Sequence, residues 1–151
     1  MGAKQARFHR IPPFFVAYNV CLGVIMAFIM YNPNPSANRV GDCVIRAISK
    51  LMGQDWDDTY LALSVKGFVL KDMPSANHVW GSYLKDKGFY KYPMPDACPD
   101  CYTVREFCDD NPFGEYLLAT GSHVVAVCDG DYYDSWDSGG EVPTEYWMRG
   151  E

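Results

Sequence analysis

Basic residues are few in this sequence, and outside its first ten positions they do not cluster. Thirteen Lys and Arg stand against 19 Asp and Glu, which gives a formal net charge of −6 at pH 7. Because proteins hold the phosphates of nucleic acids with grouped Lys and Arg side chains, this pattern argues against a nucleic-acid partner. An acidic surface is compatible with basic peptides, so we expect a peptide or protein substrate.

Histidine is equally scarce, with three residues in the whole sequence. His9 lies in the basic N-terminal stretch, and His78 begins a predicted helix without an acid partner at a useful spacing. His123 lies in residues 121–127, which are typical of a strand and precede an acid-rich segment. If the protein has a catalytic base, we expect it to be His123.

Only Cys98 and Cys101 have the CxxC spacing, although the chain holds six cysteines. A structural zinc site needs four ligands, so Cys108 and either Cys128 or His78 would have to complete the set. A zinc-stabilised interaction domain is therefore an alternative, but our expectation is a protein without a metal or cofactor.

The cysteines also lack the loop-borne spacing of a small disulfide-stapled domain. Cys21 lies in an apolar run, Cys43 begins a predicted helix and Cys128 ends a predicted strand. We therefore expect a reducing compartment, the cytoplasm, unless the N-terminal segment directs the chain to the membrane or outside the cell.

The chain has the length and composition of one ordinary domain. It contains 151 residues, of which 48% are hydrophobic, enough to bury a substantial core. We assign residues 31–151 to this domain and residues 1–30 to an N-terminal extension.

The N-terminal extension has two interpretations. Lys4, Arg7 and Arg10 precede an apolar run at residues 14–31, a pattern typical of a signal peptide or a single membrane anchor. The alternative is a poorly packed extension in which residues 27–31 form an edge strand of the core. The two interpretations differ in whether the protein associates with a membrane, and the sequence does not decide between them.

The strongest helix signal lies at residues 43–51. Apolar side chains recur there at 3.6-residue spacing, and Gly53 follows as a helix stop. These apolar positions are Val44, Ala47, Ile48 and Leu51. Cys43 falls in the first turn, where free backbone N–H groups and the helix dipole favour a thiolate over a thiol. Cys43 is therefore our candidate nucleophile.

Further helices are predicted from Asp55, over residues 79–87, and from Thr103 to about Asp110, where Thr103 and Glu106 form a capping box. Prolines punctuate residues 89–100, which we interpret as a loop. The apolar pattern then changes to the period of a strand. Three successive strands are predicted, at residues 116–120, 122–128 and 132–136. The fold class is therefore α+β, with N-terminal helices packed on a C-terminal antiparallel sheet.

The chain order of Cys43, His123 and then Asp134 or Asp137 is that of papain-like cysteine peptidases. The sequence resembles the small bacterial and phage members, in the style of the bacteriocin-processing peptidases. In these enzymes an Asp-Cys motif opens a helix and a Gly-X-His strand pairs with a strand that ends in Asp. The resemblance implies a papain-like fold and hydrolysis of a peptide or isopeptide bond through a thioester.

The turn between the last two predicted strands decides which acid serves His123. If Asp129-Gly130 is a two-residue turn, Cys128 pairs with Asp131 and Asp134 shares the face of His123. A three-residue loop would instead place Asp137 opposite His123. We favour Asp134, because Asp134-Ser135-Trp136 is similar to the Asn-Ser-Trp that contains the papain orienting residue.

The papain-like family places a Gln shortly before the cysteine, where it helps to hold the oxyanion. This sequence has no Gln there, and Asn38 is the nearest amide that could act with the backbone N–H of Cys43. The missing Gln favours an alternative function, in which a catalytically weak papain-like domain, such as a phage-encoded one, binds or inhibits another protein.

Overall fold

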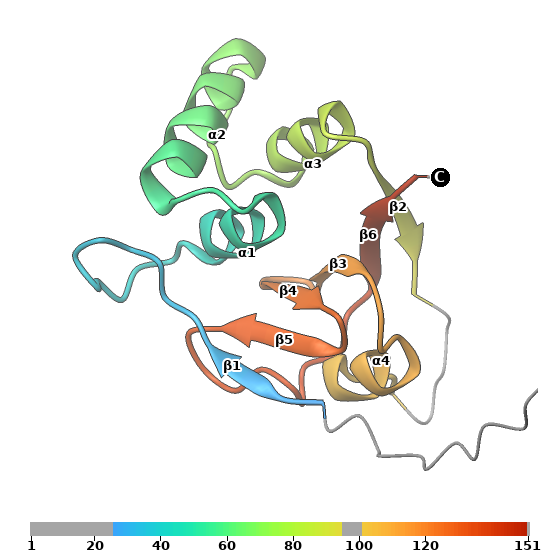
Figure 1. Ribbon diagram of the computed structural model, residues 1–151. Coiled ribbons are helices and arrows are strands. Elements are labelled where there is room, and N and C mark those ends of the chain that lie inside the picture. The colour runs from blue at the N-terminus through green and yellow to red at the C-terminus, as the bar shows by residue number, and fades with distance from the viewer. Residues whose placement is uncertain (1–25, 95–100, 151) are drawn as a thin grey trace, which may run out of the picture.

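The computed structural model describes residues 26–94 and 101–150, and these form four helices and a six-stranded sheet (Figure 1). The helices are α1 (Cys43–Met52), α2 (Trp56–Leu70), α3 (Asn77–Asp86) and α4 (Val104–Asp110). The strands are β1 (Phe28–Met30), β2 (Phe89–Pro93), β3 (Glu115–Ala119), β4 (Val124–Cys128), β5 (Asp131–Asp134) and β6 (Glu145–Arg149). The predicted α+β class is confirmed.

The sheet is mixed, which corrects the expectation of a purely antiparallel C-terminal sheet. Its strand order is β1-β5-β4-β3-β6-β2, and β1 pairs with β5 in parallel while every other pair is antiparallel. β2 lies in the segment that we predicted as a loop, and β6 was not predicted. β2 buries only Phe89, so it lacks the alternating apolar pattern by which strands are recognised.

β1 is the edge strand expected at residues 27–31. It is held to β5 by backbone hydrogen bonds, including one of 2.7 Å from Tyr31 N–H to the Asp134 carbonyl. Residues 28–30, which we had assigned to the extension, therefore belong to the domain. The apolar residues before 26, on which the signal or anchor hypothesis rests, lie outside the described residues. In the described parts of the chain, no helix is long and apolar enough to cross a membrane.

The central strands bury side chains on both faces of the sheet. On β4, Val124 and Ala126 pack in a core with α1, α2 and α3, whereas Val125 and Val127 pack in a second core with α4. In Figure 1, α1 to α3 accordingly lie on one side of the sheet and α4 on the other. A strand covered on both faces is apolar at every position, as β4 is.

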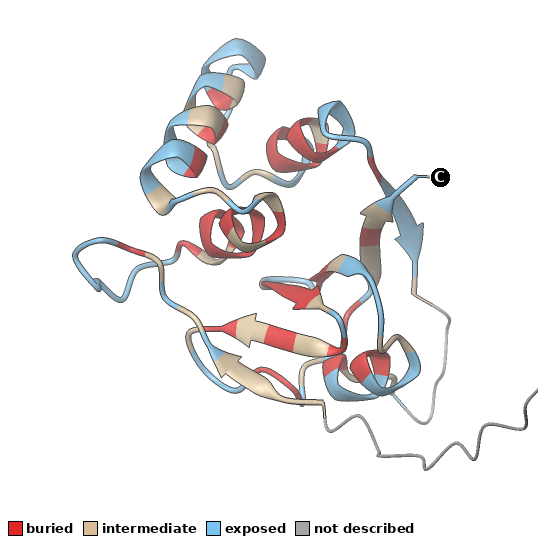
Figure 2. Cartoon of the chain, in the orientation of Figure 1, coloured by how far each residue is buried: buried red, intermediate tan, exposed pale blue. Residues whose placement is uncertain are grey.

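α1 lies between α2 and the sheet and begins and ends where its sequence predicts. Gly53 ends it with φ of 60°, a left-handed conformation that glycine adopts without steric cost, and its N–H donates to the Lys50 carbonyl. Most of its residues are buried (Figure 2). The N-terminal end of α1, with Cys43 as its first residue, therefore rests in a fixed position against β4.

Candidate active site

The β4–β5 hairpin brings His123 and Asp134 together. Its turn contains Asp129 with φ of 50° and Gly130 with φ of 83°, and Cys128 pairs with Asp131 across it. This confirms the predicted two-residue turn. His123 directly precedes β4 and Asp134 ends β5, so this register places both side chains at one end of the hairpin and on one face of the sheet.

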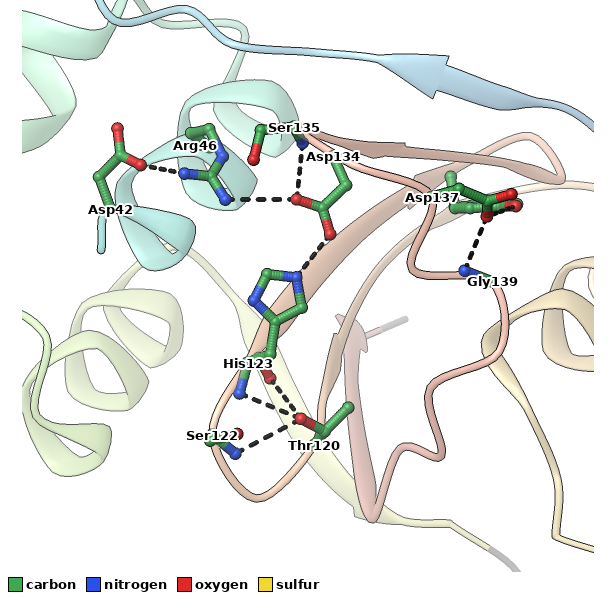
Figure 3. A network of polar contacts seen from close by, with 10 residues as sticks. Asp42, Arg46, Thr120, Ser122, His123, Asp134, Ser135, Asp137 and Gly139 are labelled. Atoms are coloured by element: carbon green, nitrogen blue, oxygen red, sulfur yellow. Dashed lines mark hydrogen bonds and ion pairs between the residues drawn. The ribbon is translucent and has the colours of Figure 1, made fainter. Parts of the chain in front are cut away.

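His123 is bound to a buried carboxylate (Figure 3). Its Nε2 donates a hydrogen bond of 2.5 Å to Oδ2 of Asp134, which is 2% exposed. The other carboxylate oxygen, Oδ1, accepts from the Ser135 backbone N–H at 2.7 Å. The carboxylate is therefore fixed on both oxygens, and the imidazole tautomer is fixed with it.

Cys43 shares a cleft with this imidazole. Cys43 and His123 both line a space of about 320 Å³. Burial alone would raise the pKa of the Cys43 thiol, but the hydrogen bonds from His123 and the Val124 backbone lower it below the ordinary value.

The charges on His123 and Asp134 support the thiolate. Burial alone would lower the pKa of His123, but its hydrogen bonds with Asp134 and Cys43 raise it to about 9. Burial likewise opposes ionisation of Asp134, yet the contact with His123 keeps its pKa below the ordinary value. Both shifts favour the charged forms, a thiolate on Cys43 and an imidazolium on His123.

Two further residues hold His123, one at its backbone and one at its ring. The Thr120 hydroxyl accepts a hydrogen bond of 3.0 Å from the His123 backbone N–H, and the Thr120 N–H donates to the His123 carbonyl at 2.8 Å. The Trp136 ring lies 5.4 Å from the imidazole, centroid to centroid. Thr120 therefore fixes the backbone of His123, and Trp136 covers one side of its ring.

Arg46 is a site residue that sequence reasoning missed. Its side chain is buried, and its Nη2 lies 3.2 Å from Oδ1 of Asp134 while its Nη1 pairs with Asp42. Trp56 Nε1 donates to the second Asp42 oxygen at 2.9 Å. The nucleophile helix is thus joined to the end of β5 by a buried ion network (Figure 3). The available signal was the spacing of four between Asp42 and Arg46 beside otherwise apolar helix positions.

Asp137, the alternative acid, does not lie beside His123. It accepts hydrogen bonds from the Tyr132 hydroxyl at 2.6 Å and from the Gly139 N–H at 3.1 Å, and Arg105 lies 3.4 Å away. The hydrogen bond from Tyr132 holds the pKa of Asp137 below its ordinary value. Its role here is local to the loop after β5.

Asn38 does not share the cleft of Cys43. It is exposed and lines a separate cavity together with Arg46 and Trp136. Within the described residues, Asn38 is therefore not placed to hold an oxyanion at Cys43.

The candidate zinc ligands are scattered where the structure describes them. Cys101 is exposed, Cys108 is buried, and His78 lies 3.5 Å from Asp72 on the surface. Burial raises the pKa of Cys108 to about 12. Cys98 lies outside the described residues, and the described ones contain no group of three or more His, Cys, Asp or Glu that could hold a metal ion.

Comparisons of this chain with protein-family models, with curated proteins and with solved structures find no match. The functional argument therefore rests on the geometry and chemistry of Cys43, His123 and Asp134.

Proposed function

We propose that this protein is a papain-like cysteine hydrolase that cleaves a peptide or isopeptide bond. Cys43 is the nucleophile, His123 the general base and acid, and Asp134 the residue that orients the imidazole. The observation that carries this proposal is that His123 is bound to a buried carboxylate and lines one cleft with Cys43. A cysteine at a helix N-terminus beside a His–Asp pair on a sheet is the arrangement that the resemblance implies.

The reaction proceeds through a thioester. The Cys43 thiolate attacks the carbonyl carbon, and His123 gives its proton to the leaving amine as the carbon–nitrogen bond breaks. A water molecule then attacks the thioester carbonyl, and His123 takes the proton of that water. The thiolate leaves the carbon, the acid product departs, and the thiolate–imidazolium pair is restored. Asp134 stabilises the positive imidazole throughout.

The oxyanion needs hydrogen-bond donors near Cys43. Cys43 is the first residue of a ten-residue helix, so its backbone N–H points out of the N-terminus and toward developing negative charge. We assign the oxyanion to this N–H. Asn38 lines the other cavity, so no side-chain amide is assigned, and we expect modest hydrolytic rates.

The test is alkylation of the full chain with iodoacetamide between pH 5 and 9, with the modified cysteines located by mass spectrometry. Cys43 should react well below pH 8.5, the usual range of a free thiol, and at lower pH than the exposed Cys101. The variant His123→Ala should lose the fast reaction at low pH, and His78→Ala serves as its matched control.

Two results would count against the proposal. One is a Cys43 that reacts like Cys101, and the other is a His123→Ala variant that keeps the wild-type pH profile. A reactive Cys43 in a protein that cleaves no peptide would instead support the second function, a papain-like domain that binds or inhibits another protein. The position of Asn38 outside the Cys43 cleft is the observation that favours this second function.

A further inference from the structure

A second cavity, of about 510 Å³, lies next to the Cys43 cleft. His123 lines the first cleft and Trp136 lines the second cavity, and their rings are 5.4 Å apart. The His123–Trp136 pair is therefore the partition between the two spaces. The polar residues and the aromatic ring that line the second cavity are Asn32, Asn38, Arg39, Arg46, Ser135 and Trp136.

The second cavity is rich in hydrogen-bond donors and cations. Two amides, two guanidinium groups and one hydroxyl line it, and no Asp or Glu of the described chain does, although the protein carries a net charge of −6. Asp42 and Asp134 neutralise Arg46 from outside the cavity. Guanidinium groups with no carboxylate inside the cavity favour an anionic ligand, and their planar shape favours a carboxylate.

The two arginines that line the cavity differ in their exposure and in the partners that they already have. Arg46 is 7% exposed, and its Nε has no hydrogen-bond partner among the described residues. Arg39 is exposed and forms no ion pair with any residue that the structure describes. The net positive charge of the cavity therefore comes from Arg39, because Arg46 is already paired with Asp42 and Asp134.

The cavity lies beside the residue that protonates the leaving group, because the Trp136 ring that lines it is next to the His123 ring. His123 must approach the leaving amine to protonate it, so the chain that carries this amine passes the imidazole. An extended peptide advances about 3.3 to 3.6 Å per residue, so a ring separation of 5.4 Å corresponds to about two residues.

We propose that the second cavity binds a carboxylate of the substrate within about three residues of the scissile bond, on its leaving-group side. This inference rests on the proposed function. The carboxylate is either an Asp or Glu side chain or the free C-terminus of a short leaving peptide. Arg39 supplies the charge, and Asn38 and Ser135 supply hydrogen bonds.

The first experiment is a cleavage profile. The wild-type full chain is incubated with a synthetic peptide library, and the cut sites are read by mass spectrometry. We expect Asp, Glu or a free C-terminus to be enriched at the three positions after the cut. In Arg39→Glu this preference should fall about five- to tenfold, as expected for loss and reversal of one exposed charge. Arg149→Glu, a distant exposed arginine, is the matched control.

The second experiment measures binding without catalysis. Cys43→Ala protein is titrated with acetyl-Ala-Ala-Glu-amide, with acetyl-Ala-Ala-Ala bearing a free carboxylate, and with neutral acetyl-Ala-Ala-Gln-amide. The Trp136 indole N–H and the Asn38 amide are followed by NMR. Both acids, or one of them, should move these signals, the neutral peptide should not, and Arg39→Glu should abolish the effect. The acid that binds identifies the source of the carboxylate.

The two experiments separate the two proposals. If wild type cleaves nothing but the acidic peptides bind in an Arg39-dependent way, the hydrolase fails and the carboxylate site stands. If wild type cleaves without preference for acids, or the preference survives Arg39→Glu, the carboxylate site is overturned and the hydrolase stands. Equal binding of the neutral and acidic peptides also overturns the site.

Discussion

The negative charge of Asp134 keeps the His123 imidazole protonated. In Asp134→Asn an amide replaces the carboxylate, so the pKa of His123 should fall from about 9 toward its ordinary 6.5 and the pKa of Cys43 should rise. The pH at which Cys43 becomes half-reactive toward iodoacetamide should therefore move up. Asp137→Asn removes an acid from the same loop but should leave the profile unchanged, because Asp137 bonds to Tyr132. A shift of equal size in both variants would contradict the assignment of Asp134.

Arg46 lies between two buried carboxylates, so its removal leaves Asp42 and Asp134 without their shared cation. Breaking a buried ion pair by removing one partner costs about 3 to 5 kcal/mol. Arg46→Met should lower the free energy of unfolding by about this amount in urea titrations at pH 7. Adding Asp42→Asn removes one uncompensated charge and should restore part of the loss. A double variant no more stable than Arg46→Met would argue against this network.

The β4–β5 turn determines where the site residues lie along the hairpin. Gly130 has φ of 83°, and an added Cβ would lie 3.2 Å from Cα of Pro112. Because an L-residue pays about 1 to 2 kcal/mol in left-handed conformation, Gly130→Ala should destabilise the protein by about that amount. Gly140→Ala is the control, since its Cβ would meet nothing within 4 Å. Chemical denaturation measures both, and equal stabilities would contradict the strained turn.

Helix α1 and the β4–β5 hairpin show what local sequence can predict. α1 was predicted to the residue at its start because helical periodicity and a glycine stop are local signals, and the hairpin register followed from Asp129-Gly130. β2 was missed because its partner, β6, lies more than 50 residues away and only one of its residues is buried. Its pairing depends on a distant strand rather than on its own pattern.

Arg46 was missed for a related reason. Its spacing from Asp42 is readable in the sequence, but its contact with Asp134 joins positions 88 residues apart. Only the packing of α1 on β4 and β5 brings the two together. Asn38 is the opposite case. It lies only five positions before Cys43 in the sequence, so we predicted that the two side chains share one site. The loop before α1 instead places Asn38 at the second cavity.

Across the whole molecule, the thiolate–imidazolium pair makes stability depend on pH in two opposing ways. The pKa of His123 is raised from 6.5 to about 9. Its contribution to the free energy of unfolding is therefore complete below pH 6.5 and is lost as the pH rises through 9. The pKa of Cys43 is lowered, so its stabilisation is lost as the pH falls from 9 through the folded value. Between the folded pKa of Cys43 and pH 9 the two dependences cancel, since folded and unfolded protein bind the same number of protons at these two groups.

Removing Cys43 should expose the contribution of His123. In Cys43→Ala, Asp134 still raises the pKa of His123, so the free energy of unfolding should fall between pH 6.5 and 9 by about 1 to 2 kcal/mol relative to wild type. The measurement is urea denaturation at half-unit steps across this range, and the difference between the two proteins cancels every other titrating group. Cys108→Ala is the control, because burial raises the pKa of that thiol to about 12 and it stays protonated throughout. Parallel curves for wild type and Cys43→Ala would mean that folding does not lower the pKa of Cys43, and the nucleophile would then need a base to activate it in every catalytic cycle.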